Sequence, residues 1–457
     1  MGLMLASYRN CGWHDSCGNP RRRLALFHHD IWAFRGMTTD GTRQNGDRHL
    51  LFIDMCYSLE TVRNRNLHQF FHSRHSGGYF KKVWGLHPMV DRVTPDRPRA
   101  VKFTEFSPDQ VVIEAAAELY RWPGHLLPVN VLVSQGKLLY TIARLVKSQD
   151  ISAIAAIDPF YTGLFGLVLK RLCRRPLIVH VIANYDDLYE ADGSLAMPQL
   201  LRFRWVEKKL AKLVYSRADL VAAGTPTLVN YAVRNGARPE RVHFFPLSKA
   251  IHPIHFTPPE QRPSPDAVLA RMNVPAADHY LLTVSRMVAI KKVVDALKAM
   301  RIVMDAEPSV IGLFAGEGPQ REELERLATA YGIRDRIVFL GGVDQETLSH
   351  IIPRCISVAP MPGMTLFESA LGGSPTIAYD RDALIAALVK DGDSGFLAEF
   401  EDYQTLGRRA LEVVRDRALR DALGRRIREN ALPYIDFDAL YRREADAFDH
   451  MFATVSP

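Results

Sequence analysis

The chain has 457 residues, of which 47% are hydrophobic and 24% charged, and its formal net charge is +7 at pH 7. This composition is ordinary for a globular protein, and the length exceeds what a single hydrophobic core usually supports, so we expect two domains. The composition argues against a fibrous, collagen-like or intrinsically disordered chain.

Targeting and crosslinking signals are weak. The best candidate for a membrane-spanning segment, residues 151–169, is interrupted by Asp158 and Pro159. No apolar stretch typical of a secretory signal follows Arg9, the first basic residue. The five cysteines are scattered, without the paired spacing of a zinc site or a disulfide framework. The sequence therefore predicts a cytoplasmic protein with buried or incidental thiols.

Residues 1–48 form the first segment. Isolated Cys, His, Arg and Trp residues occur here without helical or strand periodicity. We predict a disordered or non-native N-terminal extension. Two explanations stay open for residues 1–36: a true tail, or upstream sequence that precedes a real start at Met37.

Residues 49–255 alternate between short apolar runs and helical patterns. Such alternation predicts a parallel sheet covered by helices on both faces, here a first Rossmann-like domain. The expected strands cover residues 50–53, 82–86, 151–157, 177–183 and 219–223, and the main expected helices cover residues 129–147, 163–172 and 198–217.

A proline-rich connector, residues 256–277, precedes a second domain at residues 278–435. The same alternation predicts a second doubly wound sheet there. Its expected strands cover residues 280–284, 309–315, 336–340, 356–359 and 375–379, with helices at 293–305 and 320–331 among them. The final segment, residues 436–457, has a helical pattern and is expected to cross back to the first domain.

Three motifs of the second domain could bind a phosphorylated ligand. Arg286 and Lys291 lie between an expected strand end and a helix, where fixed cations would stabilise a leaving diphosphate; a solvated basic turn is the alternative. Gly363 opens a loop into a helix that carries Glu368, a candidate for ribose hydroxyls or merely a helix-start carboxylate. The turn Gly316-Glu317-Gly318-Pro319 lacks the third glycine of a dinucleotide fingerprint, so we predict no nicotinamide or flavin cofactor.

Taken in order, these motifs resemble those of the family-4, group 1 glycosyltransferases, which have the GT-B fold. The resemblance is close over residues 280–395 and extends to the first domain in outline only. The matching segments are Arg286 with Lys291, residues 316–319, residues 336–341, residues 363–368 and residues 391–397.

The resemblance implies two Rossmann-like domains that face a cleft, and transfer of a hexose-type sugar from a nucleoside diphosphate sugar with retention at the anomeric carbon. It implies no cofactor and no obligatory metal. Arg286 and Lys291 would stabilise the leaving diphosphate and Glu368 would hold the ribose. The donor's sugar and phosphates would contact residues of two turns, namely Gly316, Gly363, Met364 and Thr365.

The sequence departs from the family pattern at three places. Pro360 occupies the position of a glutamate that usually contacts the donor sugar. The glycine-rich loop usual after the first strand is replaced by residues 55–58. The expected histidine is missing, since His180 lies two residues early and is best interpreted as a core residue. Asp186, just beyond that strand, is our candidate for a catalytic or acceptor-orienting carboxylate.

Charge is unevenly distributed along the chain. Residues 49–255 contain 27 Lys and Arg against 17 Asp and Glu, a net of +10, whereas residues 256–457 contain 24 against 30, a net of −6. We therefore expect the first domain to meet an anionic partner, such as a phosphorylated or lipid-linked glycan acceptor or an anionic membrane surface. Nucleic acid is not expected, because no binding motif accompanies the basic residues.

The helix expected at residues 198–217 carries Trp205 beside Lys208, Lys209 and Lys212. It could rest on the inner face of a membrane or be an ordinary solvated helix. The preferred function is thus a glycosyltransferase of surface polysaccharide or glycolipid synthesis. A non-catalytic nucleotide-sugar-binding protein or partner subunit is the alternative, and epimerisation or hydrolysis of a nucleotide sugar a third.

Overall fold

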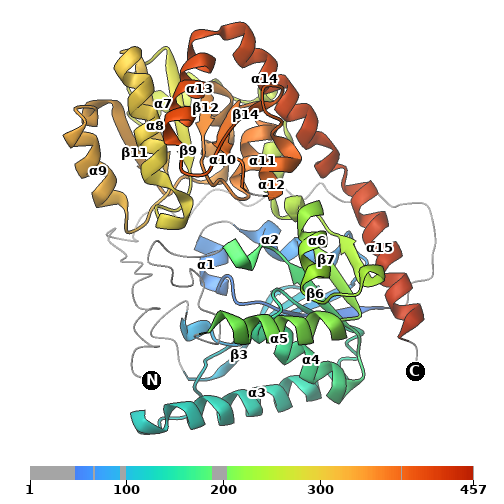
Figure 1. The fold of residues 1–457 in the computed structure, drawn as a ribbon. Coiled ribbons are helices and arrows are strands. Elements are labelled where there is room, and N and C mark those ends of the chain that lie inside the picture. Colours follow the sequence, from blue (N-terminus) through green and yellow to red (C-terminus); the bar gives the residue numbers. More distant parts are fainter. Residues whose placement is uncertain (1–46, 65–66, 93–98, 188–202, 382, 456–457) are drawn as a thin grey trace.

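The computed structural model describes residues 47–455 except 65–66, 93–98, 188–202 and 382 (Figure 1). Two parallel-sheet α/β domains lie one above the other in this view, joined by a connector and by the C-terminal helix. The fold class predicted from the sequence is therefore confirmed. The extension predicted at residues 1–48 lies almost entirely outside the described residues.

The first domain is built on an eight-stranded sheet. In spatial order its strands are β3 (Val101–Ser107), β4 (Gln110–Ala115), β2 (Lys82–His87), β1 (His49–Ile53), β5 (Ala153–Ala156), β6 (Leu177–Val181), β7 (Leu220–Ala223) and β8 (Val242–Phe244). All neighbouring strands are parallel except β3 and β4, which pair in an antiparallel hairpin at one edge. The sequence analysis missed this hairpin and the edge strand β8.

Helices cover both faces of this sheet. They are α1 (Leu59–Asn64), α2 (His68–His72), α3 (Leu127–Ser148), α4 (Tyr161–Cys173), α5 (Arg204–Arg217) and α6 (Pro226–Arg234). Between β1 and Gly77, the described part of the chain forms α1, α2 and the 3₁₀ turn Ser73–His75. The described part of the helix expected at residues 198–217 begins at Arg204, and residues 198–202 lie outside the described residues.

The second domain contains a six-stranded, fully parallel sheet. In spatial order its strands are β11 (Ile337–Gly341), β10 (Val310–Ala315), β9 (His279–Val284), β12 (Cys355–Val358), β13 (Thr376–Tyr379) and β14 (Gly395–Ala398). Its helices are α7 (Pro265–Arg271), α8 (Val293–Ala306), α9 (Arg321–Ala330), α10 (Gln345–Ile351), α11 (Thr365–Leu371), α12 (Ala383–Leu388), α13 (Tyr403–Arg415) and α14 (Arg417–Ala431). Helix α7 lies within the segment predicted as connector.

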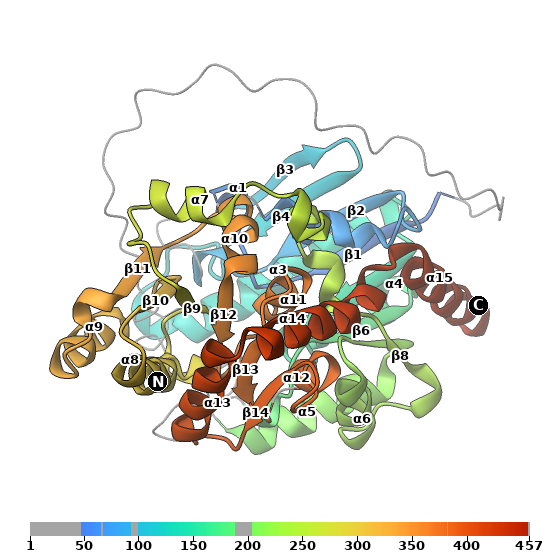
Figure 2. The ribbon, with the colours of Figure 1, turned by 90° about the horizontal axis from the view of Figure 1, so that it is seen from above.

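The C-terminal helix α15 (Phe437–Thr454) returns to the first domain, as predicted. Figure 2 shows α14 leading out of the second domain into α15. Phe448 of α15 packs edge-on against Phe80 and Phe245 of the first domain, with ring centroids 5.1 and 5.3 Å apart. Gly77 permits a close approach, because a Cβ there would lie 2.5 Å from the ring of Tyr441. Together, these contacts fasten the crossing helix to the first domain.

The carboxyl ends of the two sheets are turned toward each other. Helix α6 directly follows β7 in the first domain, and α12 follows β13 in the second. These two helices pack against each other. Because a helix that follows a parallel strand begins near the carboxyl end of that strand, the loops after the strands of both sheets border the space between the domains.

Candidate functional site

The site predicted in the second domain begins in the loop after β9. Arg286 in this loop is exposed, whereas Lys291 ends the 3₁₀ turn Ala289–Lys291 and is half-buried. Lys292 adopts a left-handed conformation with φ +52° and is the N-cap residue of α8. The loop therefore presents two cations at the carboxyl edge of the sheet, as the sequence predicted.

A glycine turn after β10 supports this loop. Gly316 has φ +136°, and a Cβ on it would lie 2.0 Å from the carbonyl oxygen of Ser285. The backbone N–H of Met287 donates a hydrogen bond to the carbonyl of Glu317 (2.8 Å). Only glycine fits at position 316, because both the conformation and the space exclude a side chain. Gly316 thus fixes the backbone beside Arg286. A direct contact of Gly316 with a nucleoside diphosphate sugar stays a prediction.

The loop after β12 approaches the same cations. Gly363 has φ +70°, and a Cβ on it would lie 3.0 Å from the Nζ atom of Lys291. Thr365 donates from Oγ1 to the carbonyls of Val284 (3.2 Å) and Pro362 (2.8 Å), so it ties the loop to the end of β9. The structure therefore brings Lys291, Gly363 and Thr365 together from segments more than 70 residues apart.

Glu368 lies one turn into α11 and is 7% exposed. Burial raises the pKa of its carboxyl group to about 7, against a hydrogen bond from Gln345 that lowers it. Gln345 in turn contacts Nε2 of His255 through its Oε1 atom (2.7 Å). The second carboxylate oxygen, Oε2, is buried without a hydrogen-bond partner among the described residues. A ligand with hydroxyl donors would satisfy that atom.

Pro360 lies at the sheet edge, two residues after the end of β12. It is buried, and its carbonyl accepts a hydrogen bond from the N–H of Tyr379 (3.2 Å). A proline side chain offers no acceptor for a sugar hydroxyl. Pro360 therefore cannot replace the glutamate that the resemblance places here.

The carboxyl edge of the first sheet, which faces the second domain, carries ionisable residues that the sequence analysis did not single out as a group. They are Asp54, His87, Glu114 and Asp158, at or directly after the ends of β1, β2, β4 and β5, and all are buried. Burial raises the pKa of Asp158 to about 6 and lowers the pKa of His87. Asp54 forms a buried ion pair with Arg74. An ionisable residue at the end of each apolar strand, or just beyond it, was the signal that could have revealed the set.

Asp186, predicted as a catalytic carboxylate, is part of an ion-pair cluster. It lies 2.8 Å from Nη2 of Arg204 and 3.0 Å from Nζ of Lys208. Burial opposes ionisation of Asp186, but hydrogen bonds from these two cations outweigh burial and lower its pKa. Such a carboxylate is a poor base, so Asp186 is better suited to orient a group than to remove a proton. Its catalytic role stays a prediction.

His180 lies within β6, in agreement with its interpretation from the sequence as a core residue of a strand. Its ring is 5.2 Å from that of Phe52, and it lines a small cavity of about 90 Å³ with Arg74 and Lys249. Burial, with the charges of Lys249 and Arg74, lowers its pKa to about 3. His180 is therefore neutral at physiological pH and unsuited to general-acid work.

Within the described residues, no three His, Cys, Asp or Glu side chains gather to hold a metal ion. The cationic groups at the edge are instead Arg286 and Lys291. Fixed cations beside a glycine loop are a means of stabilising phosphate charge. Independence from metal stays a prediction.

Comparisons with known proteins agree with this geometry, and the class that they define is the GT-B glycosyltransferases. Residues 270–430 match the family described as glycosyl transferases group 1, and residues 87–248 match the glycosyl transferase 4-like domain. Together the two matches cover most of both domains. The chain belongs to the group 1 glycosyltransferases, which confirms the resemblance drawn from the sequence.

Curated relatives match the chain only in part. A D-inositol 3-phosphate glycosyltransferase of Thermomonospora curvata is 28% identical over 53% of this chain and 58% of its own length. An alpha-monoglucosyldiacylglycerol synthase of Streptococcus pneumoniae is 24% identical over 52% of this chain and 54% of its own. The matched region thus spans little more than half the length of these relatives.

Solved structures share the fold over nearly the whole chain. A sucrose-phosphate synthase from Thermosynechococcus elongatus superposes with a TM-score of 0.66 at 18% identity, covering 89% of this chain and all of the other. HepE of Anabaena, in complex with UDP and glucose, gives a TM-score of 0.62 at 17% identity, covering 88% of this chain and all of the other. At this identity the likeness establishes the GT-B fold alone.

Proposed function

We propose that the protein transfers a hexose-type sugar, with retention, from a nucleoside diphosphate sugar to a glycan or lipid-linked acceptor in surface polysaccharide or glycolipid synthesis. One observation carries the proposal: Lys291 and Gly363 meet at the carboxyl edge of the second sheet beside Arg286. Several relatives are named for glycolipid or lipopolysaccharide synthesis, which supports the acceptor class.

The chemistry that this arrangement can perform is stabilisation of a departing diphosphate. Cleavage of the bond to the sugar leaves negative charge on the diphosphate, and fixed cations nearby lower the barrier. The backbone at Gly363 can approach the phosphates closely because no side chain intervenes. The unpaired Oε2 of Glu368 would accept hydrogen bonds from ribose hydroxyls. In this proposal no step uses a metal or a cofactor.

The outer helices of the first domain are proposed to rest on an anionic membrane. Helices α3, α4 and α5 carry ten Lys and Arg residues against a single carboxylate, Glu207, which is buried and paired with Arg204 (3.1 Å). Figure 1 shows these helices side by side on one side of the first sheet. They also expose large apolar side chains, including Leu132, Tyr140, Leu172 and Trp205. Basic and apolar groups on one surface suit an anionic lipid interface.

Helix α3 adds to this argument. With the 3₁₀ turn before it, the segment Gly124–Ser148 is long and apolar enough to cross a membrane by length and composition, and 28% of its most apolar window is buried. Core helices can pass the same test. Its buried stripe recurs every fourth residue, at Asn130, Ser134, Leu138, Ile142 and Val146, so α3 packs on the domain by one side. The other side, with Leu132 74% exposed, is available for lipid.

A non-catalytic nucleotide-sugar-binding protein is the second candidate. The observation that favours it is Pro360, which supplies no carboxylate where the family usually has one. This candidate predicts donor binding without turnover.

Release of nucleoside diphosphate distinguishes the two candidates. Purified protein is mixed with UDP-, GDP-, ADP- and dTDP-sugars, with and without membrane extract as acceptor. Release with one donor that requires the extract, and that falls at least about 100-fold in Arg286→Ala/Lys291→Ala, supports transfer. Binding without release under every acceptor condition would establish the non-catalytic protein instead. The anomeric configuration of the product, read by NMR, tests retention.

Co-sedimentation with anionic vesicles tests whether the outer helices of the first domain bind a membrane. Lys209→Glu/Lys212→Glu should abolish co-sedimentation, because both side chains are exposed on α5. The matched control Arg326→Glu/Arg408→Glu changes the charge equally in the second domain, where both residues are exposed. Equal sedimentation of the two variants would refute the lipid interface.

A further inference from the structure

A second basic pocket lies at the opposite edge of the second sheet. Its cavity of about 670 Å³ is bordered by Asp278 before β9, Cys355 at the start of β12 and Pro375 before β13. These positions mark the amino ends of the strands, whereas Arg286 and Gly363 follow the carboxyl ends. The pocket is therefore separate from the proposed donor site, and its volume falls within the range of small-molecule sites.

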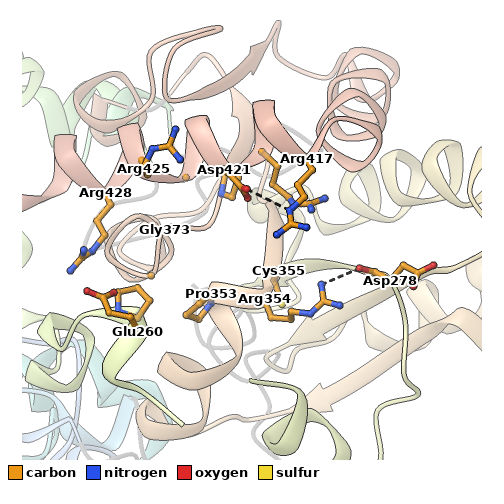
Figure 3. A pocket seen from close by; sticks show the side chains of 15 residues that line it. Glu260, Asp278, Pro353, Arg354, Cys355, Gly373, Arg417, Asp421, Arg425 and Arg428 are labelled. Carbon is orange, nitrogen blue, oxygen red and sulfur yellow. Dashed lines mark hydrogen bonds and ion pairs between the residues drawn. The ribbon is translucent and has the colours of Figure 1, made fainter. Parts of the chain in front are cut away.

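Five arginines line the pocket against three carboxylates. The arginines are Arg354, Arg417, Arg420, Arg425 and Arg428, and the carboxylates are Glu260, Asp278 and Asp421. In Figure 3, Arg417, Arg425 and Arg428 project from α14 above the cavity, and Arg354 lies below. Arg428 reaches down toward Glu260 on the far wall. The lining thus carries an excess of two positive charges.

Three of these guanidinium groups have no carboxylate partner among the described residues. Arg428 donates from Nε to the carbonyl of Leu371 (3.1 Å), which leaves its two Nη groups without a described bond. Arg420 contacts only Nδ1 of His279 (3.2 Å) and the carbonyl of Val414 (3.5 Å). Arg425 is exposed and makes no ion pair or hydrogen bond with the described residues. In contrast, Arg354 is 3.1 Å from Asp266, and Arg417 is 3.7 Å from Asp421.

Positive charge predominates along this part of α14. The helix begins with Arg417, directly after its N-cap residue Asp416, whose carboxylate accepts a hydrogen bond from the N–H of Leu419 (2.9 Å). Burial lowers the pKa of Arg420; the charge of Asp421 opposes this shift, and the charges of Arg354 and Arg417 add to it. An uncompensated cluster of this kind is stabilised when an anion enters it.

Small residues keep the pocket open. Gly373 has φ +68°, and a Cβ on Gly424 would lie 2.4 Å from the carbonyl oxygen of Gly373. Helices α11 and α14 therefore meet through backbone, without side chains that would fill the cavity between them. The guanidinium groups then surround an open space. Each guanidinium group can bind two oxygens of a phosphate group.

We propose that this pocket binds a small anion with two or more phosphate groups. Two phosphates suit it better than one, because three unpaired guanidinium groups line an open cavity and each can hold two phosphate oxygens. Pro259 and Glu260 of the interdomain connector also border the pocket, as does α14, which leads into the crossing helix α15.

Titration calorimetry tests the proposal in full-length protein. The background variant Arg286→Ala/Lys291→Ala weakens the donor site, so that the heat reports the second pocket. Inorganic pyrophosphate should bind, and Arg425→Ala/Arg428→Ala added to this background should weaken binding at least about tenfold, because charge-assisted hydrogen bonds are lost. The matched control Arg426→Ala should bind normally, since Arg426 lies on the same helix but pairs with Glu429 (3.2 Å) outside the pocket.

The affinities of pyrophosphate and nucleoside diphosphates distinguish two classes of ligand for the pocket. Tighter binding of pyrophosphate than of nucleoside diphosphates assigns the pocket to a free phosphorylated metabolite, and the reverse order assigns it to a nucleotide. Arg425→Ala alone gives an independent result, since this side chain has no described partner whose loss could unfold the domain. Equal pyrophosphate affinity in the background, Arg425→Ala and Arg426→Ala proteins, or no binding to the background protein, would overturn the proposal.

Discussion

Substitution of Gly363 by alanine tests whether Lys291 must lie beside the glycine loop. Two costs follow from the structure. At φ +70° an alanine is strained by about 1–2 kcal/mol, which lowers the melting temperature by about 2–8 °C in a domain of this size. In addition, the new methyl group would lie 3.0 Å from Nζ of Lys291 and would shift the ammonium group. Because a charged contact to a diphosphate is worth about 1.5–3 kcal/mol, its weakening lowers kcat/KM by up to about 100-fold.

Gly332→Ala is the matched control. Gly332 has the same φ of +70°, but a Cβ there would have no atom within 4 Å. Both variants should therefore lose similar stability in thermal melts, while only Gly363→Ala should lose nucleoside diphosphate release. Equal activity of the two variants would refute the placement of Lys291 as a diphosphate ligand.

Three further predictions concern the charged groups of both domains. The fold raises the pKa of Glu368 from 4.5 to about 7, so between these pH values unfolding releases a proton. The free energy of unfolding should therefore fall as the pH rises from about 4.5 to 7. In urea melts at several pH values, Glu368→Gln should reduce that decline by at most about 3 kcal/mol. Arg204→Ala should destabilise the protein by about 3 kcal/mol in urea melts, because it removes the guanidinium group that pairs with buried Glu207 and with Asp186. Lys208→Ala, whose side chain is exposed, should cost less than about 1 kcal/mol. Glu444→Ala should cost about 3–5 kcal/mol by the same assay, because it removes the buried partner of Lys249 that joins α15 to the first domain.

The parallel strands were predictable because each is a short apolar run buried on both faces. Leu50–Ile53 and Tyr280–Val284 are examples in the two sheets, and the structure shifts their bounds by one residue. Strand β3 escaped prediction because its polar and apolar residues alternate, with Phe103 exposed, and so lack that signature. Local pattern thus identifies buried strands better than edge strands.

The site was predictable only where its residues are close in sequence. Arg286 and Lys291 lie in one loop, so their spacing carried the prediction. The approach of Lys291 to Gly363 joins segments after β9 and β12, and no local pattern encodes that contact. Likewise, the pairing of Asp186 with Arg204 depends on how the chain returns 18 residues later. Tertiary contacts of this kind determine which predicted residues act together.

Thermal stabilisation by nucleoside diphosphates tests the central claim most directly, since it reports the donor site without an acceptor. At least one of UDP, GDP, ADP and dTDP should raise the melting temperature of the wild-type protein. That stabilisation should persist in Arg425→Ala/Arg428→Ala, which weakens the second pocket, and should be largely lost when Arg286→Ala/Lys291→Ala is added to that background. Stabilisation that the addition of Arg286→Ala/Lys291→Ala leaves unchanged would contradict a donor site built on these two cations.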